Sequence, residues 1–499
     1  MTGVAHSSVS SSYLRKRLGA GVWPAAVPVL VGVAHVPEFA HRLLDGDEAI
    51  YGTIAVLMNK GGDLYGAGGV DNKPPGVFWV YSLTFRIFGD YQMAAVHAVG
   101  FLAMAATCLV LFLIARDLAG RRAGLLAALF YGLGTAAGNP RLGATNTEVL
   151  MMLPLAASVL FLLRRNWLLS GLLLVAAGAF RQSAAINLLL VPFAIAWLAS
   201  SRPAAIARFS LGVVAGLGAG GLLLMTTSSL EGFWRWTIET LTGYASVNWT
   251  PAFVWLRAKD SIVPFVIDMA VIWIAAIALA TRWRELDAGH RLMVLWLVAG
   301  MAGSLAGGHL SWHYFIQAIG PLAVLAAIAF DRIHVRRLVA AAAVLAIAVP
   351  AAGWWAFDLT ADPLTYDFNP PVPQHQQVAD YIVAHTSPSD RVFIWGDWPA
   401  VYVESDRVMA SRFPGFLRGF ARGSDVPPNN WDTAPDVWPL LRSDLDAHPP
   451  ALIVDTAAAG WSDFSKYPMS NYPVLANLIA TRYHQVAVVD GVVIYARNG

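Results

Sequence analysis

The sequence predicts a polytopic α-helical membrane protein that carries a small α/β domain at its C-terminus. The first observation is composition, because 57% of the 499 residues are hydrophobic and the mean hydropathy is +0.54. The second is charge: Asp, Glu, Lys and Arg make up 13% of the chain, against roughly 25% in an average soluble domain. So few charges exclude both a soluble enzyme and a disordered chain. The net charge of +2 gives no indication of a nucleic-acid partner.

The third observation is that apolar stretches recur from about residue 22 to about residue 356, each near the ~20 residues needed to cross the hydrocarbon. We expect about eleven membrane spans, at 22–39, 93–115, 123–138, 148–163, 167–181, 183–199, 210–228, 261–281, 292–306, 314–330 and 338–356. Residues 1–356 are therefore the predicted membrane domain, and residues 357–499 are predicted to form a separate domain.

Basic residues predict the orientation of these spans. They precede the first span, as Arg15, Lys16 and Arg17, and then follow every second span. Short basic connections lie in the cytoplasm, so the N-terminus is expected there and everything after residue 356 outside. We interpret 22–39 as an uncleaved first span of a multi-pass protein of the cell (inner) membrane, although its basic flank also fits a signal sequence.

Two of the outside connections are long, at about 40–92 and about 229–260, and long loops of this kind are usually functional or disordered. The apolar residues of 48–58 in the first loop fall on one side of a helix, so we expect this helix to lie along the membrane surface. The second loop is rich in tryptophan. These side chains are expected to be interface anchors, with stacking on a sugar as the alternative.

Residues 357–499 are expected to form an external α/β domain, because helical and strand patterns alternate along them. The predicted order is helix 375–386, strand 392–395, helix 435–447, strand 452–455, helix 473–482, strand 485–489 and strand 492–495. Asp490 and Gly491, between the last two strands, predict a type I′ hairpin turn.

The first outside loop holds the residues best suited to chemistry. Asp45, Asp47 and Glu48 follow the first span, and Lys73 stands directly before two prolines that keep the backbone extended. A rigid lysine facing a pair of carboxylates suits a phosphate-bearing ligand next to a general base. The alternative for Asp47 is the N-cap of the helix that begins at Glu48.

The motifs of this loop resemble those of a known superfamily. Residues 47–51 (Asp-Glu-Ala-Ile-Tyr), then Gly-Gly-Asp-Leu-Tyr, then residues 72–76 (Asn-Lys-Pro-Pro-Gly) look like the first loop of the C-type (GT-C) integral membrane glycosyltransferases. The similar branch contains protein O-mannosyltransferases and lipid A aminoarabinose transferases. Three further places in the membrane part fit that branch: residues 145–148 (Thr-Asn-Thr-Glu), 180–182 (Phe-Arg-Gln) and 313–315 (His-Tyr-Phe).

The resemblance implies a GT-C fold with a site at the outer membrane face, in which loop 40–92 is catalytic. It implies Asp47 as the general base with Glu48 beside it, and a sugar or acceptor pocket lined by further side chains. The implied residues are Asp47 and Glu48 (catalytic), Lys73 and Arg181 (donor phosphate), and Asn146, Glu148, His313 and Tyr314 (substrate pocket). Three of these residues have a simpler alternative: an N-cap for Glu148, snorkelling for Arg181 and an interface position for His313.

Asp47 and Glu48 are also the candidate ligands of a divalent cation such as Mg²⁺ or Mn²⁺, through their carboxylate oxygens. No organic cofactor is expected. His309 and His313 have the spacing of a zinc pair on a helix, but Gly307 and Gly308 argue against a helix there.

The expected function is transfer of a sugar from a polyprenyl-phosphate-linked donor to an acceptor hydroxyl of a glycan, lipid or protein, with inversion at the anomeric carbon. A transporter or flippase of a lipid-linked or anionic solute is the alternative. It would need charge near the middle of the membrane and an internal repeat, whereas the ionisable residues cluster at one face and the sequence shows no repeat. A non-catalytic membrane scaffold is a third hypothesis, and the first-loop motif weighs against it.

Overall fold

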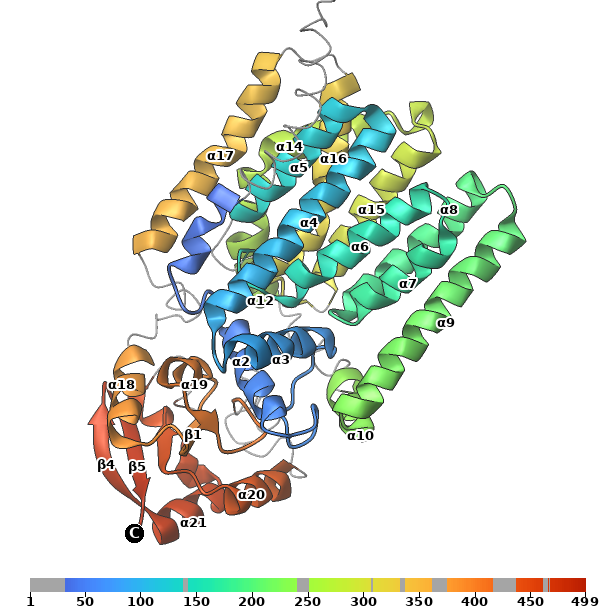
Figure 1. Cartoon of the computed structure of the whole chain (residues 1–499). Coiled ribbons are helices and arrows are strands. Elements are labelled where there is room, and N and C mark those ends of the chain that lie inside the picture. The colour runs from blue at the N-terminus through green and yellow to red at the C-terminus, as the bar shows by residue number, and fades with distance from the viewer. Residues whose placement is uncertain are drawn as a thin grey trace, which may run out of the picture.

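The computed structural model describes residues 32–137, 142–239, 251–306, 308–332, 337–360, 375–415, 437–460, 465 and 467–499. A bundle of long helices forms one end of the molecule and a small α/β part the other, with helices α2 (Gly46–Asn59) and α3 (Gly76–Phe88) between them (Figure 1). This arrangement confirms the predicted fold class. The predicted first span lies mostly outside the described residues, and its described end contains the 3₁₀ helix η1 (Val36–Phe39).

The helices of the bundle follow the predicted spans from residue 93 onward. They are α4 (Met93–Ala119), α5 (Arg121–Ala136), α6 (Thr147–Leu163), α7 (Trp167–Gly178), η3 (Gln182–Leu189), α8 (Leu190–Leu198), α9 (Arg202–Thr227), α13 (Val263–Asp268), α14 (Ala270–Ala280), α15 (Ala288–Leu305), α16 (Ile316–Arg332) and α17 (Arg337–Thr360). Shorter helices connect them: α10 (Leu230–Phe233), a π-helical turn (Trp234–Glu239), α12 (Pro251–Arg257), a second π-helical turn (Ala258–Ile262), η6 (Trp283–Glu285) and η7 (Trp312–Phe315).

Within the described residues, five helices are long and apolar enough to cross a membrane, or six if Pro251–Asp268 and Ala270–Ala280, which meet at 77°, form one span. Further apolar helices of 10–17 residues, α6 and α7 among them, stand beside these. The expected number of about eleven spans stays a prediction.

Helix α16 is the centre of the bundle. Its apolar stretch is wholly buried inside the protein, whereas only 22% of the corresponding stretch of α9 or of α17 is buried. It packs against α5, α14 and α15. A helix that is apolar all round is stable only where protein or lipid surrounds it. The outer helices therefore expose apolar side chains, such as Leu211, Val214 and Leu222 of α9.

Glycines allow α7 and α9 to pack with their backbones in contact. A Cβ atom at Gly171 would lie 2.3 Å from the carbonyl oxygen of Phe209, and one at Gly212 would lie 2.0 Å from that of Leu168. Small residues at such crossings are characteristic of helix pairs in membranes, where close packing replaces the hydrophobic effect as the main attraction.

The helix expected at 48–58 is present as α2, but the expectation that it lies on the membrane surface is wrong. Residues 48–58 are all buried. Helix α3 covers α2 on one side, and α19 (Ala400–Ser405) and strand β2 (Val408–Met409) of the C-terminal part pack on it as well. The amphipathic pattern correctly predicted an apolar face, but it could not show that protein rather than lipid would cover it.

Helix α3, and not α2, has apolar side chains that are exposed on the surface of the protein. Leu83, Ile87 and Phe88 are 60%, 65% and 61% exposed, while Phe78 and Phe85 on the other side are buried. An amphipathic helix with such an apolar outer face suits the boundary between the bundle and water.

The C-terminal part contains a five-stranded mixed sheet in the order β2-β1-β3-β5-β4. Its elements are α18 (His375–His385), β1 (Arg391–Trp395), α19, β2, α20 (Trp438–Ala447), β3 (Leu452–Asp455), α21 (Pro473–Arg482), β4 (Tyr483–Val489) and β5 (Val492–Arg497). Strand β1 is parallel to β2 and β3, and β5 is antiparallel to β3 and β4. The predicted helices and strands are all present to within a few residues. Helix α19 and strand β2 were not expected, because two strand residues are too few to show an alternating pattern.

The turn between β4 and β5 has the backbone that its sequence predicts. Asp490 has φ 49° and Gly491 has φ 82°. A type I′ turn requires positive φ at both central residues, which is why Asp-Gly favours it.

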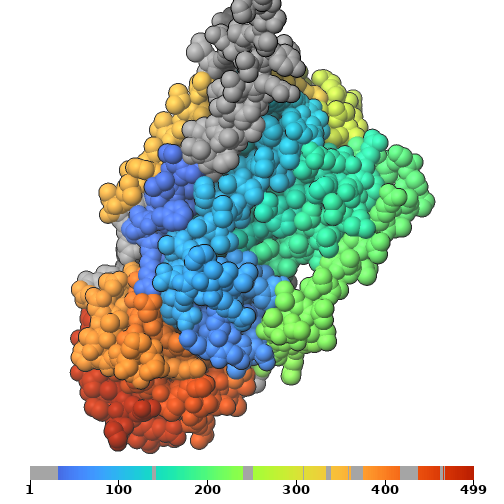
Figure 2. Space-filling view, in the orientation of Figure 1, coloured from blue at the N-terminus to red at the C-terminus, as the bar shows by residue number. Residues whose placement is uncertain are grey.

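The C-terminal part shares its hydrophobic core with the first loop. One cluster of buried side chains runs from Ile54 and Tyr81 of α2 and α3 to Trp395 and Ile453 of the sheet. Polar contacts join the two as well, since Arg42 pairs with Asp406. In Figure 2 the blue atoms of the first loop lie directly against the orange and red atoms of the C-terminal part. The loop is therefore held between the helix bundle and the C-terminal sheet.

Candidate functional site

The predicted site residues come together where the bundle meets the α2–α3 region. Asp47 lies in the first turn of α2, and Lys73 lies in the segment between α2 and α3. Glu148 lies in the first turn of α6, Arg181 lies at the break between α7 and η3, and His313 lies in η7. Four separate chain segments outside α2 thus meet at its N-terminus, as the sequence predicted from the positions of the span ends.

Asp47 and Lys73 face each other. The Nζ atom of Lys73 lies 3.8 Å from Oδ2 of Asp47 and 3.9 Å from Oδ1 of Asp71. The hydroxyl of Tyr51 donates to Oδ2 of Asp47 over 3.3 Å. Burial, and then the neighbouring Asp47 carboxylate, raise the pKa of Tyr51 well above its ordinary value, so this hydroxyl stays protonated and remains a donor.

Asp47 is the most accessible carboxylate of the group. Its side chain is 20% exposed, whereas those of Asp45, Asp71 and Glu148 are 5%, 0% and 0% exposed. A group that takes a proton from a bound molecule must reach that molecule. Exposure therefore favours Asp47 over the neighbouring acidic residues as a general base.

Arg181 does not reach out to an interface. It forms an ion pair with the buried carboxylate of Glu148, and its guanidinium lies over the ring of Tyr314, 3.8 Å from the centroid. The Arg181 side chain is 12% exposed. A cation held between a carboxylate and an aromatic face keeps its charge in a poorly solvated place, so Arg181 presents a fixed positive charge at the site.

His313 lies among three carboxylates. Its Nδ1 is 3.5 Å from Oδ2 of Asp45, and its Nε2 is 3.9 Å from Oδ2 of Asp47 and 3.8 Å from Oε1 of Glu148. The ring meets that of Tyr314 edge to face, with centroids 4.8 Å apart. His313 therefore connects the acidic turn of α2 to the Glu148–Arg181 pair.

Asp45 and Asn146 hold the site together from behind. Oδ1 of Asp45 accepts the backbone N–H of Asp47 and so caps α2, as Asp commonly does. Oδ2 of Asp45 accepts the side-chain amide of Asn146 over 2.8 Å. Asn146 is fully buried, so it supports Asp45 and is not placed to contact a substrate, which is the role that the resemblance implied for it. The N-cap of α2 is thus Asp45 and not Asp47, which was the alternative role for Asp47.

Glu48 faces away from Asp47. Its Oε1 accepts the backbone N–H of Thr145 over 2.7 Å, and its Oε2 accepts that of Leu44 over 2.9 Å. Nε2 of His97 lies 3.3 Å from Oε2. This fully buried carboxylate joins α2 to the segment that carries Asn146, which favours a positioning role for Glu48 over a catalytic one.

The same geometry bears on the candidate site for a divalent cation. Both carboxylate oxygens of Glu48 are engaged by protein donors, so Glu48 is not placed to share a metal ion with Asp47. Among the described residues, no group of three or more His, Cys, Asp or Glu side chains is arranged to hold a metal ion. His309 lies outside any helix, as the glycines beside it predicted, which removes the spacing argument for zinc.

The segment that carries Lys73 is fixed at several points. The hydroxyl of Tyr65 donates to the carbonyl of Lys73 over 2.7 Å, and the backbone N–H of Lys73 donates to Oδ1 of Asp71 over 2.9 Å. The side-chain amide of Gln182 donates to the carbonyl of Asn72 over 2.9 Å. No role for Tyr65 or Asp71 was predicted from the sequence, although Asp71 directly precedes the 72–76 motif that contains Lys73.

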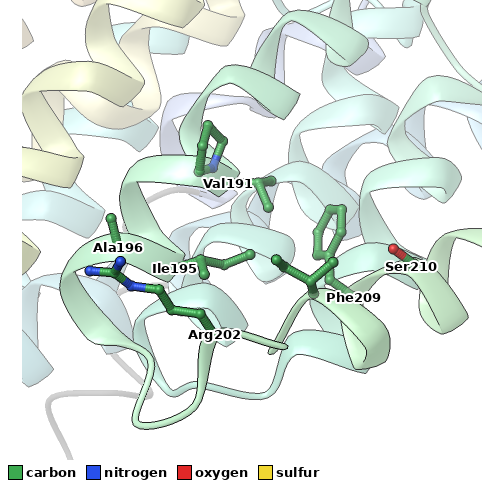
Figure 3. A pocket seen from close by; sticks show the side chains of 8 residues that line it. Val191, Ile195, Ala196, Arg202, Phe209 and Ser210 are labelled. Atoms are coloured by element: carbon green, nitrogen blue, oxygen red, sulfur yellow. The ribbon is translucent and has the colours of Figure 1, made fainter. Parts of the chain in front are cut away.

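An apolar pocket of about 340 Å³ lies elsewhere, between α8 and α9 (Figure 3). Its lining is Val191, Pro192, Ile195, Ala196, Arg202, Ile206, Phe209 and Ser210. None of the predicted site residues lines it, and it lacks the carboxylates that the expected chemistry needs.

Comparisons with known proteins identify a similar family and a shared fold. Residues 72–230, which include Lys73, Glu148 and Arg181, match the family described as dolichyl-phosphate-mannose-protein mannosyltransferase. No curated protein sequence matches the chain.

Three solved structures are similar in fold. ArnT from Cupriavidus metallidurans bound to undecaprenyl phosphate has a TM-score of 0.63 at 16% identity, over 96% of this chain and 98% of that one. The oligosaccharyltransferase of Archaeoglobus fulgidus, tethered to an acceptor peptide, gives 0.54 at 12% identity, over 96% and 74%. The arabinofuranosyltransferase AftD from Mycobacteria gives 0.50 at 15% identity, over 96% and 40%. The chain has the fold that these enzymes share.

Proposed function

We propose that this membrane glycosyltransferase of the GT-C fold transfers a sugar from a polyprenyl-phosphate-linked donor to an acceptor hydroxyl, with Asp47 as the general base. The observation that carries the proposal is the meeting of a partly exposed carboxylate with two fixed cations. Lys73 lies beside Asp47, and Asp47 lies beside His313. His313 in turn lies beside the Glu148–Arg181 pair. The similar ArnT structure has undecaprenyl phosphate bound, which supports a donor of this class here.

The two cations suit the phosphate of the donor. When the bond between the anomeric carbon and the phosphate oxygen breaks, the leaving polyprenyl phosphate gains negative charge. Lys73 and Arg181 would stabilise that charge, and preorganised electrostatic stabilisation is usually the largest catalytic term. Arg181 is held in place by Glu148 and Tyr314, so it does not have to reorganise during the reaction.

Asp47 suits the acceptor side. The acceptor oxygen forms a bond with the anomeric carbon as the bond to phosphate breaks on the opposite face, and the acceptor proton passes to Asp47. This single displacement inverts the anomeric carbon. Positive charge builds on the sugar ring in such a transition state. The negative charges of Asp47 and the neighbouring Glu148 would stabilise that positive charge. Asn146 and Glu48 support this arrangement from behind through Asp45 and Thr145.

The proposal includes an orientation. The basic connections would lie in the cytoplasm, and loop 40–92 and the C-terminal part would lie outside, at the outer face of the inner membrane. A lipid-linked donor fits that face, because its prenyl chain stays in the membrane while its phosphate and sugar enter the site. The acceptor would be a hydroxyl of a glycan, lipid or protein, and the C-terminal part would help to select it.

The test is transfer from a radiolabelled polyprenyl-phosphate sugar in membranes that contain Asp47→Asn or Lys73→Ala. Lys60 and Asp90 supply matched controls, because they form an exposed ion pair of 2.8 Å in the same loop. Both site variants should lose at least about 100-fold in turnover, and Lys60→Ala and Asp90→Asn should retain it. Near-normal turnover in both site variants would show that the proposed roles are wrong. Solute uptake into proteoliposomes without a covalent product would instead support a transporter.

A further inference from the structure

We propose that the Arg412–Asp444 ion pair of the C-terminal part positions Lys73, so that this part completes the donor-phosphate site. The inference rests on the proposed function, because it assigns to Arg412 and Asp444 an effect on the phosphate contact made by Lys73. Both residues lie in the C-terminal part, outside the sequence motifs of the membrane part, and both act as positioning residues.

The pair is unusually well formed. Oδ2 of Asp444 accepts the backbone N–H and the Nε–H of Arg412, each over 2.9 Å, and Oδ1 accepts Nη2–H over 2.7 Å. The two side chains are only 17% and 11% exposed. A bidentate Arg–carboxylate pair has one preferred geometry. The added bond to the backbone N–H means that Asp444 fixes the main chain at Arg412 as well as its side chain.

The main chain at Arg412 is in turn bound to the first loop. Its carbonyl accepts the backbone N–H of Val70 over 3.0 Å, three residues before Lys73. The next residue, Phe413, packs edge to face on Trp236 of the second loop, with ring centroids 6.1 Å apart. The segment around Arg412 is therefore held between α20 on one side and both long loops on the other.

The segment before Lys73 is held by turn hydrogen bonds, such as that from the Tyr65 N–H to the Gly69 carbonyl, and by contacts with other parts of the chain. It contains no helix or strand between Asn59 and Gly76 apart from one isolated bridge at Leu64. Gly69 has φ +112°, a backbone conformation that glycine adopts readily. Glycine also loses more conformational freedom on folding than other residues, so this position is costly to order. Tyr65 and Gln182 fix the segment at Lys73 and Asn72, and Arg412 fixes it at Val70.

The position of the Lys73 side chain depends on the hydrogen bond between Val70 and Arg412, three residues away. Its Nζ lies 3.8 Å from Asp47 and 3.9 Å from Asp71, at the outer limit of an ion-pair contact. A displacement of about 1 Å at a reacting or binding group can cost roughly 100-fold in rate. Asp444 lies on α20 of the C-terminal part, and it can therefore affect phosphate binding through Arg412 and Val70.

The experiment is a double-mutant cycle on the purified full chain in nanodiscs, with undecaprenyl phosphate as the probe and its dissociation constant as the readout. The variants are Asp444→Asn, Lys73→Ala and the two combined. Asp446→Asn is the matched control, because Asp446 lies on the same helix and pairs with Arg482 at 2.7 Å on the exposed surface. We expect Asp444→Asn to weaken binding at least about fivefold, and Asp446→Asn to leave it unchanged.

The cycle separates positioning from general damage. If Asp444 acts through Lys73, Asp444→Asn has no further effect in the Lys73→Ala background. An equal loss in both backgrounds, or no loss in either, overturns the inference. Unchanged binding in Lys73→Ala alone overturns the proposed phosphate contact, and the inference with it. Should Asp444→Asn not yield folded protein, Arg412→Lys, which keeps the charge and the backbone N–H, serves in the same cycle and leads to the same decision.

Discussion

The carboxylate of Asp45 accepts a hydrogen bond of 2.8 Å from the side-chain amide of Asn146, which lies 101 residues further along the chain. The same carboxylate caps α2 by accepting the backbone N–H of Asp47. Two neighbouring aspartates thus have different tasks. Asp45 joins two parts of the fold, and Asp47 is left with its carboxylate toward Lys73 and His313.

The first prediction separates these two tasks. Asp47→Ala should abolish turnover, a loss of about 10²–10⁴-fold if Asp47 is the base, while the melting temperature stays near that of the wild type. Asp45→Ala should lower the free energy of unfolding by about 2–4 kcal/mol, because α2 loses its cap and the buried amide of Asn146 loses its partner. Thermal unfolding in detergent and a transfer assay on the same preparations measure both. The opposite pattern would identify Asp45 as the base.

The second prediction concerns the buried Glu148–Arg181 pair. Glu148→Gln should destabilise the protein by about 3–5 kcal/mol, because it leaves the arginine uncompensated in a buried place. The double variant Glu148→Gln/Arg181→Gln should recover much of that loss in stability and still be inactive. Asp117→Asn is the control, because Asp117 pairs with Arg116 and Arg164 on an exposed surface where such pairs contribute about 0–1 kcal/mol. Additive losses in the double variant would show that the two side chains do not interact as described.

The third prediction tests the close contact that places the Asn146 segment. A Cβ atom at Gly100 would lie 2.3 Å from Oγ1 of Thr145, and Thr145 is fully buried. Gly100→Ala should therefore displace Thr145, cost about 1–3 kcal/mol of stability and reduce turnover. Gly218→Ala is the control, because nothing lies within 4 Å of a Cβ atom there. Equal behaviour of the two variants would mean that the Gly100 contact yields without consequence.

The fourth prediction is a pH dependence in the C-terminal part. Burial raises the pKa of Asp455 to about 6, against the opposing effect of the Ala457 N–H bond. The folded state therefore prefers the protonated acid. The resulting penalty is absent below about pH 4, grows up to about pH 6 and is complete above it, where it amounts to roughly 2–3 kcal/mol. Asp455→Asn should remove this penalty.

The measurement is the difference in melting temperature between Asp455→Asn and the wild-type chain from pH 4 to pH 7.5. It should be near zero at the acid end and should favour the variant above pH 6. Asp446→Asn, which changes an exposed carboxylate of the same domain, should show no such trend. If the variant gained most in melting temperature at low pH, the trend would have the wrong sign for a raised pKa of Asp455 and would contradict the prediction.

Much of the fold followed from local patterns in the sequence. The apolar stretches located the bundle helices from α4 to α17, because a helix in lipid needs a long apolar run. The alternation of helical and strand patterns located β1, β3, β4 and β5. Asp490-Gly491 determined its turn by itself, since few residues other than glycine tolerate positive φ. These features depend on neighbours in sequence, so they can be found without coordinates.

The convergence of Asp47, Lys73, Glu148, Arg181 and His313 was also predictable, because a membrane places the ends of successive spans at two levels only. The partners of each side chain were not. Whether Asp45 or Asp47 caps α2, and whether Glu48 faces the site or Thr145, depends on side-chain directions that differ by a single residue along a helix.

The sequence by itself therefore determined that this chain is a membrane protein, where most of its helices and strands lie, and which polar residues meet at one end of the bundle. Only the tertiary structure decided that protein covers α2, that Arg181 is held by Glu148 and Tyr314, and that Arg412 binds the loop of Lys73. The physical reason is that the spacing of apolar residues specifies which face of a helix is buried. The segment that covers that face is selected by packing between parts of the chain that lie tens to hundreds of residues apart.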